Sequence, residues 1–159
     1  MATIPKNAPV TVVLNSSLFV SGGYESAKSS KTHYLYANGT KVPGPNMPNS
    51  RRDHCSVTTH DGRVFIIGGD SPNQRTVLIF NPKDGSFTDG PTLLYDTNNA
   101  VCTLFYSPMH DGRPIILAAS GWYSNTDKGR ILDYTFVNVW EECKYRGCSH
   151  ITFATFPNL

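Results

Sequence analysis

A short motif recurs along the chain and constrains the fold more than any other feature of the sequence. His60-Asp61-Gly62-Arg63 returns 50 residues later as His110-Asp111-Gly112-Arg113. Each copy precedes an apolar run that ends in a small pair, Gly68-Gly69 in the first case and Ser120-Gly121 in the second. An earlier pair, Gly22-Gly23, lies 46 residues before Gly68-Gly69. This spacing indicates a repeat array, in which each copy forms one structural unit and buries its faces on its neighbours.

Each unit contains four short strand-like segments, which predicts one four-stranded antiparallel sheet per repeat. Asp61-Gly62 is a strong signal for a hairpin turn between the first and second strands. The segment 81–85 turns the third strand into the fourth, because Pro82 fixes φ and Gly85 accepts a positive φ. The expected strands are 10–14, 18–21, 32–36 and 40–42; 54–59, 63–67, 76–80 and 86–88; and 100–105, 114–119, 129–132 and 137–140.

Composition agrees with an all-β protein and excludes several other classes. Charged residues make up only 16% of the 159 residues and aromatic residues 11%, which argues against disorder. The 13 glycines and 11 prolines argue against a helix bundle. The net charge of +2 is too balanced for a dedicated nucleic-acid binder, and no stretch approaches the roughly 18 apolar residues of a membrane span. We therefore expect neither nucleic acid nor a membrane as a partner.

The glycine pairs predict a crowded centre shared by the repeats. We expect each pair to end a strand close to a common axis, where neighbouring sheets converge and a Cβ would clash. An aromatic residue about 18 positions later, Phe87 or Trp140, is expected to pack on the outer part of the same sheet.

These segments resemble the kelch-repeat family. After the glycine pair, the middle repeat continues with Ile79-Phe80-Asn81-Pro82, and the third repeat carries Asn138-Val139-Trp140. Between the first two repeats, Pro45-Asn46-Met47-Pro48 and then Arg51-Arg52-Asp53-His54 are similar to the kelch inter-blade segment. The resemblance implies part of a kelch-type β-propeller with about three four-stranded antiparallel blades. The kelch-repeat region would span 8–142, with blades at about 8–48, 53–94 and 98–142, followed by a tail or incomplete blade at 143–159.

Three blades are fewer than the roughly four to eight that close a propeller. A fan of three sheets leaves its first and last faces open, each an apolar patch with unpaired edges. The chain is then a piece of a longer protein, or two copies complete a six-bladed ring by self-association. A truncated product without independent function is a third reading.

The resemblance implies protein binding through the surface loops. Kelch propellers commonly grip peptides through the face that carries their inter-blade connections, where Arg pairs with acidic groups. We therefore expect a non-catalytic interaction module that binds a protein or peptide, with an acidic peptide suited to it, as in substrate-recruiting adaptors. Tyr, Trp and Arg dominate interface hot spots. The candidate partner-binding residues are Tyr24, Arg51, Arg52, Arg75, Tyr95, Trp122, Tyr123 and Lys128. The alternative for Arg51 and Arg52 is that they brace neighbouring blades.

The sequence contains no recognisable catalytic set, so we expect no enzyme activity, no cofactor and no metal. Cys143, Cys148 and His150 supply three potential zinc ligands, whereas structural zinc sites usually have four. His60 and His110 are related by repetition and do not converge on one site. A fragment of a kelch-like copper-radical oxidase is the competing hypothesis, although the Cys-linked Tyr and paired His of such enzymes are not recognisable here.

The cysteines and the first residues favour the cytoplasm as the default location. Cys55 and Cys102 fall at matching places on first strands and are expected to be small core residues. Four cysteines are too few for a disulfide scaffold, and residues 1–23 contain no apolar run of signal-peptide length. Two glycosylation sequons, Asn15-Ser16-Ser17 and Asn38-Gly39-Thr40, matter only if the chain enters the secretory pathway.

Overall fold

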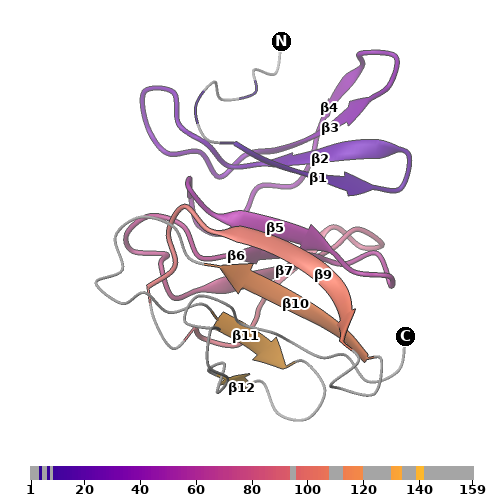
Figure 1. The fold of residues 1–159 in the computed structure, drawn as a ribbon. Coiled ribbons are helices and arrows are strands. Elements are labelled where there is room, and N and C mark those ends of the chain that lie inside the picture. The colour runs from indigo at the N-terminus through magenta and orange to yellow at the C-terminus, as the bar shows by residue number, and fades with distance from the viewer. Residues whose placement is uncertain are drawn as a thin grey trace.

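Three four-stranded antiparallel sheets lie one on the next in the computed structural model, which describes residues 4, 7, 9–93, 96–107, 113–119, 130–133 and 139–141 (Figure 1). In each sheet the strands follow one another in chain order. The strands are β1 (Val10–Leu14), β2 (Ser17–Ser21), β3 (Thr32–Tyr36) and β4 (Lys41–Pro43); β5 (Cys55–Thr58), β6 (Val64–Ile67), β7 (Val77–Asn81) and β8 (Ser86–Asp89); and β9 (Val101–Ser107), β10 (Arg113–Ala119), β11 (Arg130–Asp133) and β12 (Val139–Glu141).

The all-β prediction is confirmed. The observed strands agree with the expected ones to within two residues at each end, and the described residues contain no helix. None of the described segments is therefore a helix of the length and apolarity needed to cross a bilayer.

The turns form where the sequence indicated them. Gly62 has a φ of 84° and Gly85 a φ of 74°, a left-handed conformation that glycine adopts without steric cost. Asp61 fixes the first of these turns by accepting hydrogen bonds from the Thr59 hydroxyl and from Arg63. Although burial opposes the shift, these bonds hold the pKa of the Asp61 carboxyl below its usual value.

The repeat extends into the connections between the sheets. Asp53 and Asn99 are 46 residues apart, and each has a left-handed backbone, with φ of 56° and 51°. Each lies just before the first strand of its sheet, β5 or β9. Asp and Asn adopt this conformation more readily than most residues. The sequence repeat is therefore also a repeat of backbone conformation.

The core consists of two apolar layers, one between each pair of successive sheets. In the first layer, Phe19 of β2 stacks on Phe80 of β7 with ring centroids 4.8 Å apart, and Phe87 of β8 packs against Phe80 at the same distance. Phe65 and Ile67 belong to the second layer, which faces Ile115 and Ile116 of β10. The second sheet contributes alternate residues of β6 and β7 to the two layers, as the two-residue period of a strand requires. The outer position expected for Phe87 is confirmed.

The crowding at the glycine pairs is confirmed, but its cause differs from the expected one. The strands that approach one another across the sheets are the first ones, since β5 contacts both β1 and β9. Gly22 and Gly68 instead end the second strands, β2 and β6. A Cβ on Gly22 would lie 2.3 Å from the Arg51 carbonyl oxygen, and one on Gly68 would lie 2.2 Å from the Thr97 carbonyl oxygen. The connection to the next sheet crosses directly over each glycine, so the connecting backbone excludes a side chain there.

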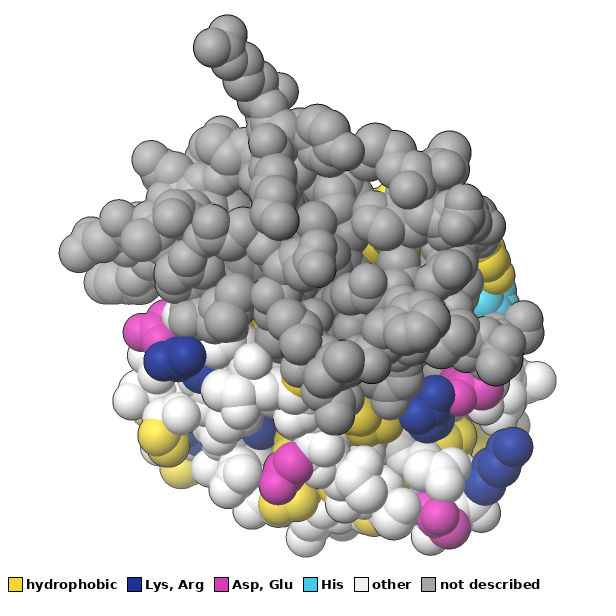
Figure 2. Space-filling model, turned by 90° about the horizontal axis from the view of Figure 1, so that it is seen from below, with side chains coloured by type: hydrophobic (Ala, Val, Ile, Leu, Met, Phe, Trp, Pro, Cys, Tyr) yellow, Lys and Arg dark blue, Asp and Glu magenta, His cyan; other side chains and the backbone are white. Residues whose placement is uncertain are grey.

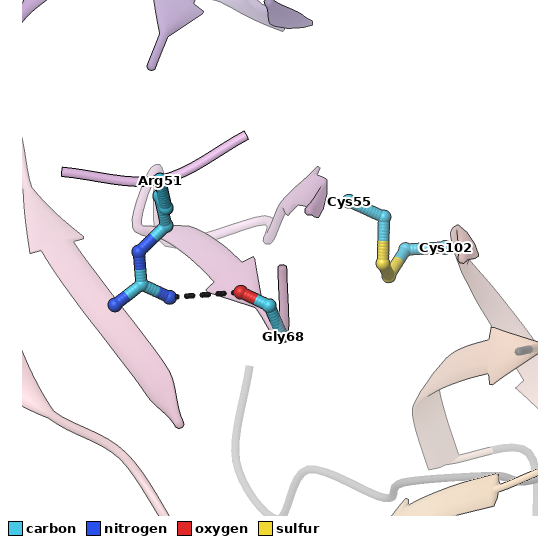
Figure 3. The surroundings of a disulfide bond; sticks show 4 residues. All are labelled: Arg51, Cys55, Gly68 and Cys102. Atoms are coloured by element: carbon cyan, nitrogen blue, oxygen red, sulfur yellow. Dashed lines mark hydrogen bonds between the residues drawn. A yellow bond between two sulfur atoms is a disulfide. The ribbon is translucent and has the colours of Figure 1, made fainter. Parts of the chain in front are cut away.

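A disulfide bond joins Cys55 to Cys102 and thus links the second sheet to the third (Figure 3). The expectation that these were separate small core residues was wrong in this respect, although Cys55 is buried. The two Cα atoms are 5.6 Å apart, within the usual range for a disulfide. Matching positions on the first strands of successive sheets are close in space because β5 and β9 are in contact.

Candidate interaction surface

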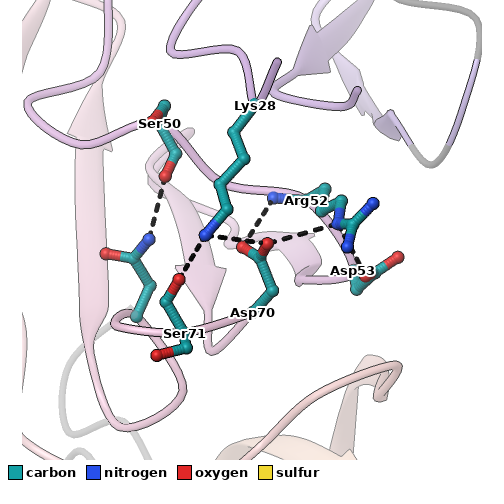
Figure 4. Close-up of polar contacts among 7 residues, drawn as sticks. Lys28, Ser50, Arg52, Asp53, Asp70 and Ser71 are labelled. Atoms are coloured by element: carbon teal, nitrogen blue, oxygen red, sulfur yellow. Dashed lines mark hydrogen bonds and ion pairs between the residues drawn. The ribbon is translucent and has the colours of Figure 1, made fainter. Parts of the chain in front are cut away.

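A polar network joins three loops at one end of the first two sheets (Figure 4). The loops are the β2–β3 loop at 22–31, the connection between the sheets at 49–54, and the β6–β7 loop at 68–76. We call these three segments the loop end. The two hairpin turns of each of these sheets, β1–β2 with β3–β4 and β5–β6 with β7–β8, lie at the opposite end, because successive turns of an antiparallel sheet alternate between its ends.

Asp70 is the centre of this network. Its carboxylate accepts a hydrogen bond from Arg52 Nε at 3.2 Å and lies 3.0 Å from Lys28 Nζ. Lys28 Nζ also donates to the backbone oxygen of Ser71. Asp70 is only 7% exposed, and a buried carboxylate needs such cationic partners to offset its loss of hydration. The three loops are therefore held together by one carboxylate and two cations.

Tyr24 and Arg52, both expected at this surface, lie together. The Arg52 guanidinium carbon is 4.7 Å from the centroid of the Tyr24 ring, a cation–π arrangement. Arg52 Nε is also 3.4 Å from an Asp53 carboxylate oxygen. The Arg52 side chain remains 39% exposed, so this corner is both ordered and open to solvent.

Arg51, in contrast, does not lie among the exposed residues. Its side chain is fully buried, and Nη1 donates a hydrogen bond to the Gly68 backbone oxygen at 3.1 Å (Figure 3). Among the described residues, its Nε and Nη2 atoms have no hydrogen-bond partner. Burial lowers the pKa of the guanidinium to about 10, against the opposing influence of Asp70 and Asp89. This placement corresponds to the bracing alternative, since Arg51 connects the inter-sheet segment to the end of β6.

Arg75 is exposed and lies on the same loop as Asp70. Its Nε donates to the Leu93 backbone oxygen at 2.9 Å, which fixes the orientation of the guanidinium. The four remaining candidates lie outside the described residues; they are Tyr95, Trp122, Tyr123 and Lys128.

Sequence reasoning missed three residues that organise the surface: Lys28, Asp70 and Asn73. The Asn73 side chain is buried and donates to the Ser50 backbone oxygen at 2.9 Å. Asp70 had a detectable signal, because it follows a glycine pair directly, as Tyr24 does 46 residues earlier. Lys28 gave no comparable signal, because its ion pair with Asp70 spans two repeats.

Charges of both signs are mixed on the surface. On the face shown in Figure 2, basic and acidic side chains of the described residues lie beside one another, without a large region of one sign. The β2–β3 loop also forms a polar hollow next to the Asp70 network, lined by residues 25–31. The loop end therefore combines paired charges of both signs with a polar hollow, consistent with the small net charge of the sequence.

His54 is buried just before β5. Its Nε2 is 2.9 Å from the Ser21 hydroxyl oxygen, which belongs to the preceding sheet. Burial, and then the charge of Arg51, lower the pKa of His54 to about 3, with Asp70 acting in the opposite direction. His54 is therefore a neutral residue that connects the first two sheets. His60 lies at the opposite, hairpin end, where it contacts the Tyr106 hydroxyl.

Stability should fall as the pH is lowered from 7 to 5. The unfolded chain takes up a proton at His54 below about pH 6.5, whereas the folded chain does not until about pH 3. Each pH unit below 6.5 should therefore cost about 1.4 kcal/mol of unfolding free energy, or about 2 kcal/mol by pH 5. Urea unfolding at several pH values measures this slope.

Replacing the histidine in the variant His54→Gln should reduce the slope of unfolding free energy against pH by nearly one proton. Burial and nearby lysines also lower the pKa of His33, which adds a dependence of the same sign in both proteins. An unchanged slope in His54→Gln would contradict the assignment.

No group of three or more His, Cys, Asp or Glu side chains within the described part of the chain is placed to hold a metal ion. His54 and His60 lie at opposite ends of β5, and His54 already contacts Ser21. His110 and His150 lie outside the described residues.

The fold is that of part of a kelch-type β-propeller: four-stranded antiparallel sheets packed face to face, with their first strands in contact. The Kelch motif model matches residues 51–94, which contain the second sheet and the connection before it. Two galactose oxidase sequences from Gibberella zeae are each 31% identical over 80 residues, covering 48% of this chain and 12% of theirs. The resemblance to kelch repeats is thus confirmed, but these curated relatives are galactose oxidases, and not kelch-like adaptors.

Solved structures support the same fold. The structure of YjhT superposes with a TM-score of 0.59 at 15% identity, over 76% of this chain and 35% of that one. A novel fungal alcohol oxidase of the AA5 family, in complex with copper, also gives 0.59, at 19% identity, over 74% of this chain and 28% of that one. The chain spans about an eighth of the galactose oxidases and about a third of these structures.

Proposed function

We propose that the chain is a non-catalytic protein-binding part of a kelch propeller and that its loop end takes an acidic segment of a partner protein. The observation that supports this proposal is the exposed Arg75 beside an already ordered group of loops. Its Nε is fixed on Leu93, which leaves the two terminal nitrogens oriented for a two-pronged contact with a carboxylate.

The charge balance of the loop end favours Arg75 as the anchor. Asp70 and Asp53 already compensate Lys28 and Arg52. No acidic side chain in the described part of the chain forms a salt bridge with Arg75. Because the neighbouring loops are held by the Asp70 network, little conformational freedom would be lost on binding. Tyr24 would add apolar contact area at the same end, and the kelch resemblance suggests an adaptor that recruits its partner in this way.

Reversing the charge of Arg75 should weaken binding of an acidic peptide. A fluorescently labelled peptide rich in Glu and Tyr serves as the probe, and fluorescence anisotropy measures its affinity. Arg75→Glu should raise the dissociation constant about tenfold or more, since each tenfold step corresponds to about 1.4 kcal/mol. The same peptide should bind more weakly as salt is added.

Lys83→Glu provides a matched control. It makes the same charge change at the exposed β7–β8 turn, at the opposite end of the second sheet. If both variants lose affinity equally, the peptide responds to net charge and not to the loop end, and the proposal fails.

The galactose oxidase and alcohol oxidase matches raise a second candidate, a piece of a copper oxidase. Within the described part of the chain, no three His, Cys, Asp or Glu side chains lie together as ligands for a metal ion. Titration with Cu(II) and intact-mass measurement distinguish the two proposals. Stoichiometric copper binding, with loss of two hydrogens in a Tyr–Cys crosslink, would favour the oxidase, whereas neither should occur in an interaction module.

A further inference from the structure

We propose that this chain folds in the oxidising secretory pathway and that Asn15 and Asn38 carry N-linked oligosaccharides on their Nδ2 atoms. Two independent observations lead to this inference. One is the disulfide between successive sheets, and the other is the placement of both sequons on exposed hairpin turns. The inference does not depend on the proposed function.

The disulfide indicates in which compartment the chain folds. Cys55 and Cys102 join the first strands of two sheets, and Cys55 is only 5% exposed. Structural disulfides form and persist in oxidising compartments, while thiols are kept reduced in the cytosol. Formation of the bond removes two protons and two electrons from the thiols and passes them to a disulfide oxidant, which becomes a dithiol. A cytosolic location would leave two thiols facing each other at the contact between β5 and β9.

Asn15 lies in the turn between β1 and β2. The residue is exposed and has a φ of 52°, a left-handed conformation that Asn adopts more readily than most residues. Ser17, the third residue of this sequon, begins β2, and its hydroxyl donates to the Leu14 backbone oxygen at 3.0 Å. The sequon therefore lies in a surface turn, and Asn-x-Ser/Thr acceptors are found in surface segments of secreted proteins.

Asn38 lies in the turn between β3 and β4. Asn38, Gly39 and Thr40 are all exposed. The Asn38 side-chain oxygen accepts a hydrogen bond from the Thr40 backbone nitrogen at 3.0 Å, which forms an Asx turn. This bond uses the oxygen of the amide and not Nδ2, the atom that carries a glycan.

The two turns lie at the same end of the first sheet. In Figure 1 the β1–β2 and β3–β4 hairpins extend to the right, away from the β2–β3 loop. Because that loop carries Tyr24 and Lys28, oligosaccharides on Asn15 and Asn38 would leave the loop end accessible. One end of the sheet would be covered by sugar while the other remained open to a partner.

The transfer step requires a lipid-pyrophosphate-linked oligosaccharide as the co-substrate. The amide Nδ2 forms a bond to C1 of the first sugar as the bond from C1 to the pyrophosphate oxygen breaks. One amide proton is released, and the lipid pyrophosphate is the leaving group.

The test expresses the full coding sequence, with no added signal sequence, in cultured eukaryotic cells. Treatment of the purified protein with peptide N-glycosidase should lower its apparent mass on a gel by the mass of two oligosaccharides. Asn15→Gln and Asn38→Gln should each remove one unit, and the double variant should show no shift. Asn49→Gln is the matched control, since Asn49 is exposed and followed by Ser50 but lacks Ser or Thr at the third position.

A second measurement on the unaltered protein avoids any dependence on variant folding. Deglycosylation in heavy-oxygen water converts each occupied Asn to labelled Asp, which mass spectrometry should find at 15 and 38. Alkylation without reductant should leave Cys55 and Cys102 linked in one peptide pair. Unlabelled Asn15 and Asn38 would overturn the assignment of the glycans. Alkylation of Cys55 and Cys102 without reductant would overturn the assignment to an oxidising compartment.

Discussion

Gly68→Ala should be among the most destabilising single substitutions in this chain, lowering the unfolding free energy by about 2–5 kcal/mol. A left-handed backbone costs a residue with a Cβ about 1–2 kcal/mol, and Gly68 has a φ of 67°. The new Cβ would also lie 2.2 Å from the Thr97 carbonyl oxygen, and forced overpacking adds about 1–3 kcal/mol. Urea unfolding, followed by far-ultraviolet circular dichroism, measures the loss of unfolding free energy.

Gly62→Ala separates the two contributions. Gly62 has a φ of 84°, but a Cβ there would meet no atom within 4 Å. This variant should therefore lose only the conformational part, about 1–2 kcal/mol. Equal losses in the two variants would show that the connection does not press on Gly68, and would contradict the crowding described for the glycine pairs.

Removing the disulfide should have an effect of similar size. The bond closes a loop with a sequence separation of 47 residues, for which the chain-entropy model gives about 4 kcal/mol. The double variant Cys55→Ala, Cys102→Ala should therefore unfold at a much lower urea concentration than the oxidised protein. Alanine avoids placing an unpaired hydroxyl at the buried Cys55 position.

A reductant supplies the internal control for this second experiment. Dithiothreitol should lower the stability of the unaltered chain toward that of the double variant, and it should leave the double variant unchanged. If the reductant lowers both equally, the loss comes from another source. If it affects neither, the bond does not stabilise the contact between β5 and β9.

The two predictions concern different parts of the junctions between sheets. The glycine pairs leave room for the segment that connects one sheet to the next. The disulfide instead links two first strands, β5 and β9. Loss of either should loosen neighbouring sheets without altering the hydrogen bonds within each sheet. Amide hydrogen exchange that rises first in the segments connecting the sheets, while the strand amides stay protected, would distinguish this from unfolding of a single sheet.

Much of the fold could be predicted from the sequence because the signals that define each repeat lie within short stretches of the chain. The turn at Asp61-Gly62 and the apolar strand that follows it specify a hairpin without information from elsewhere in the chain. A second copy 50 residues later then indicates an array, since two such sheets have faces to bury on each other. This reasoning placed every described strand to within two residues.

The candidate surface could be predicted only in part from the sequence, and Arg51 and Arg52 show why. The two residues are adjacent and chemically identical, so composition gives both the same expected role. The extended connection turns one guanidinium toward the Gly68 carbonyl in the interior and the other toward Tyr24 and Asp70 at the surface. Which of two neighbouring side chains is buried depends on how the connection lies across both sheets.

The sequence by itself determined the all-β class, the strand positions and the places where a side chain is excluded, because turns, apolar alternation and glycine act over a few residues. Only the tertiary structure decided that Cys55 meets Cys102, that Asp70 gathers Lys28 and Arg52, and that Arg51 is buried. Each of these contacts joins residues from different sheets or connections. Their distances follow from how the sheets stack, and stacking depends on the whole chain.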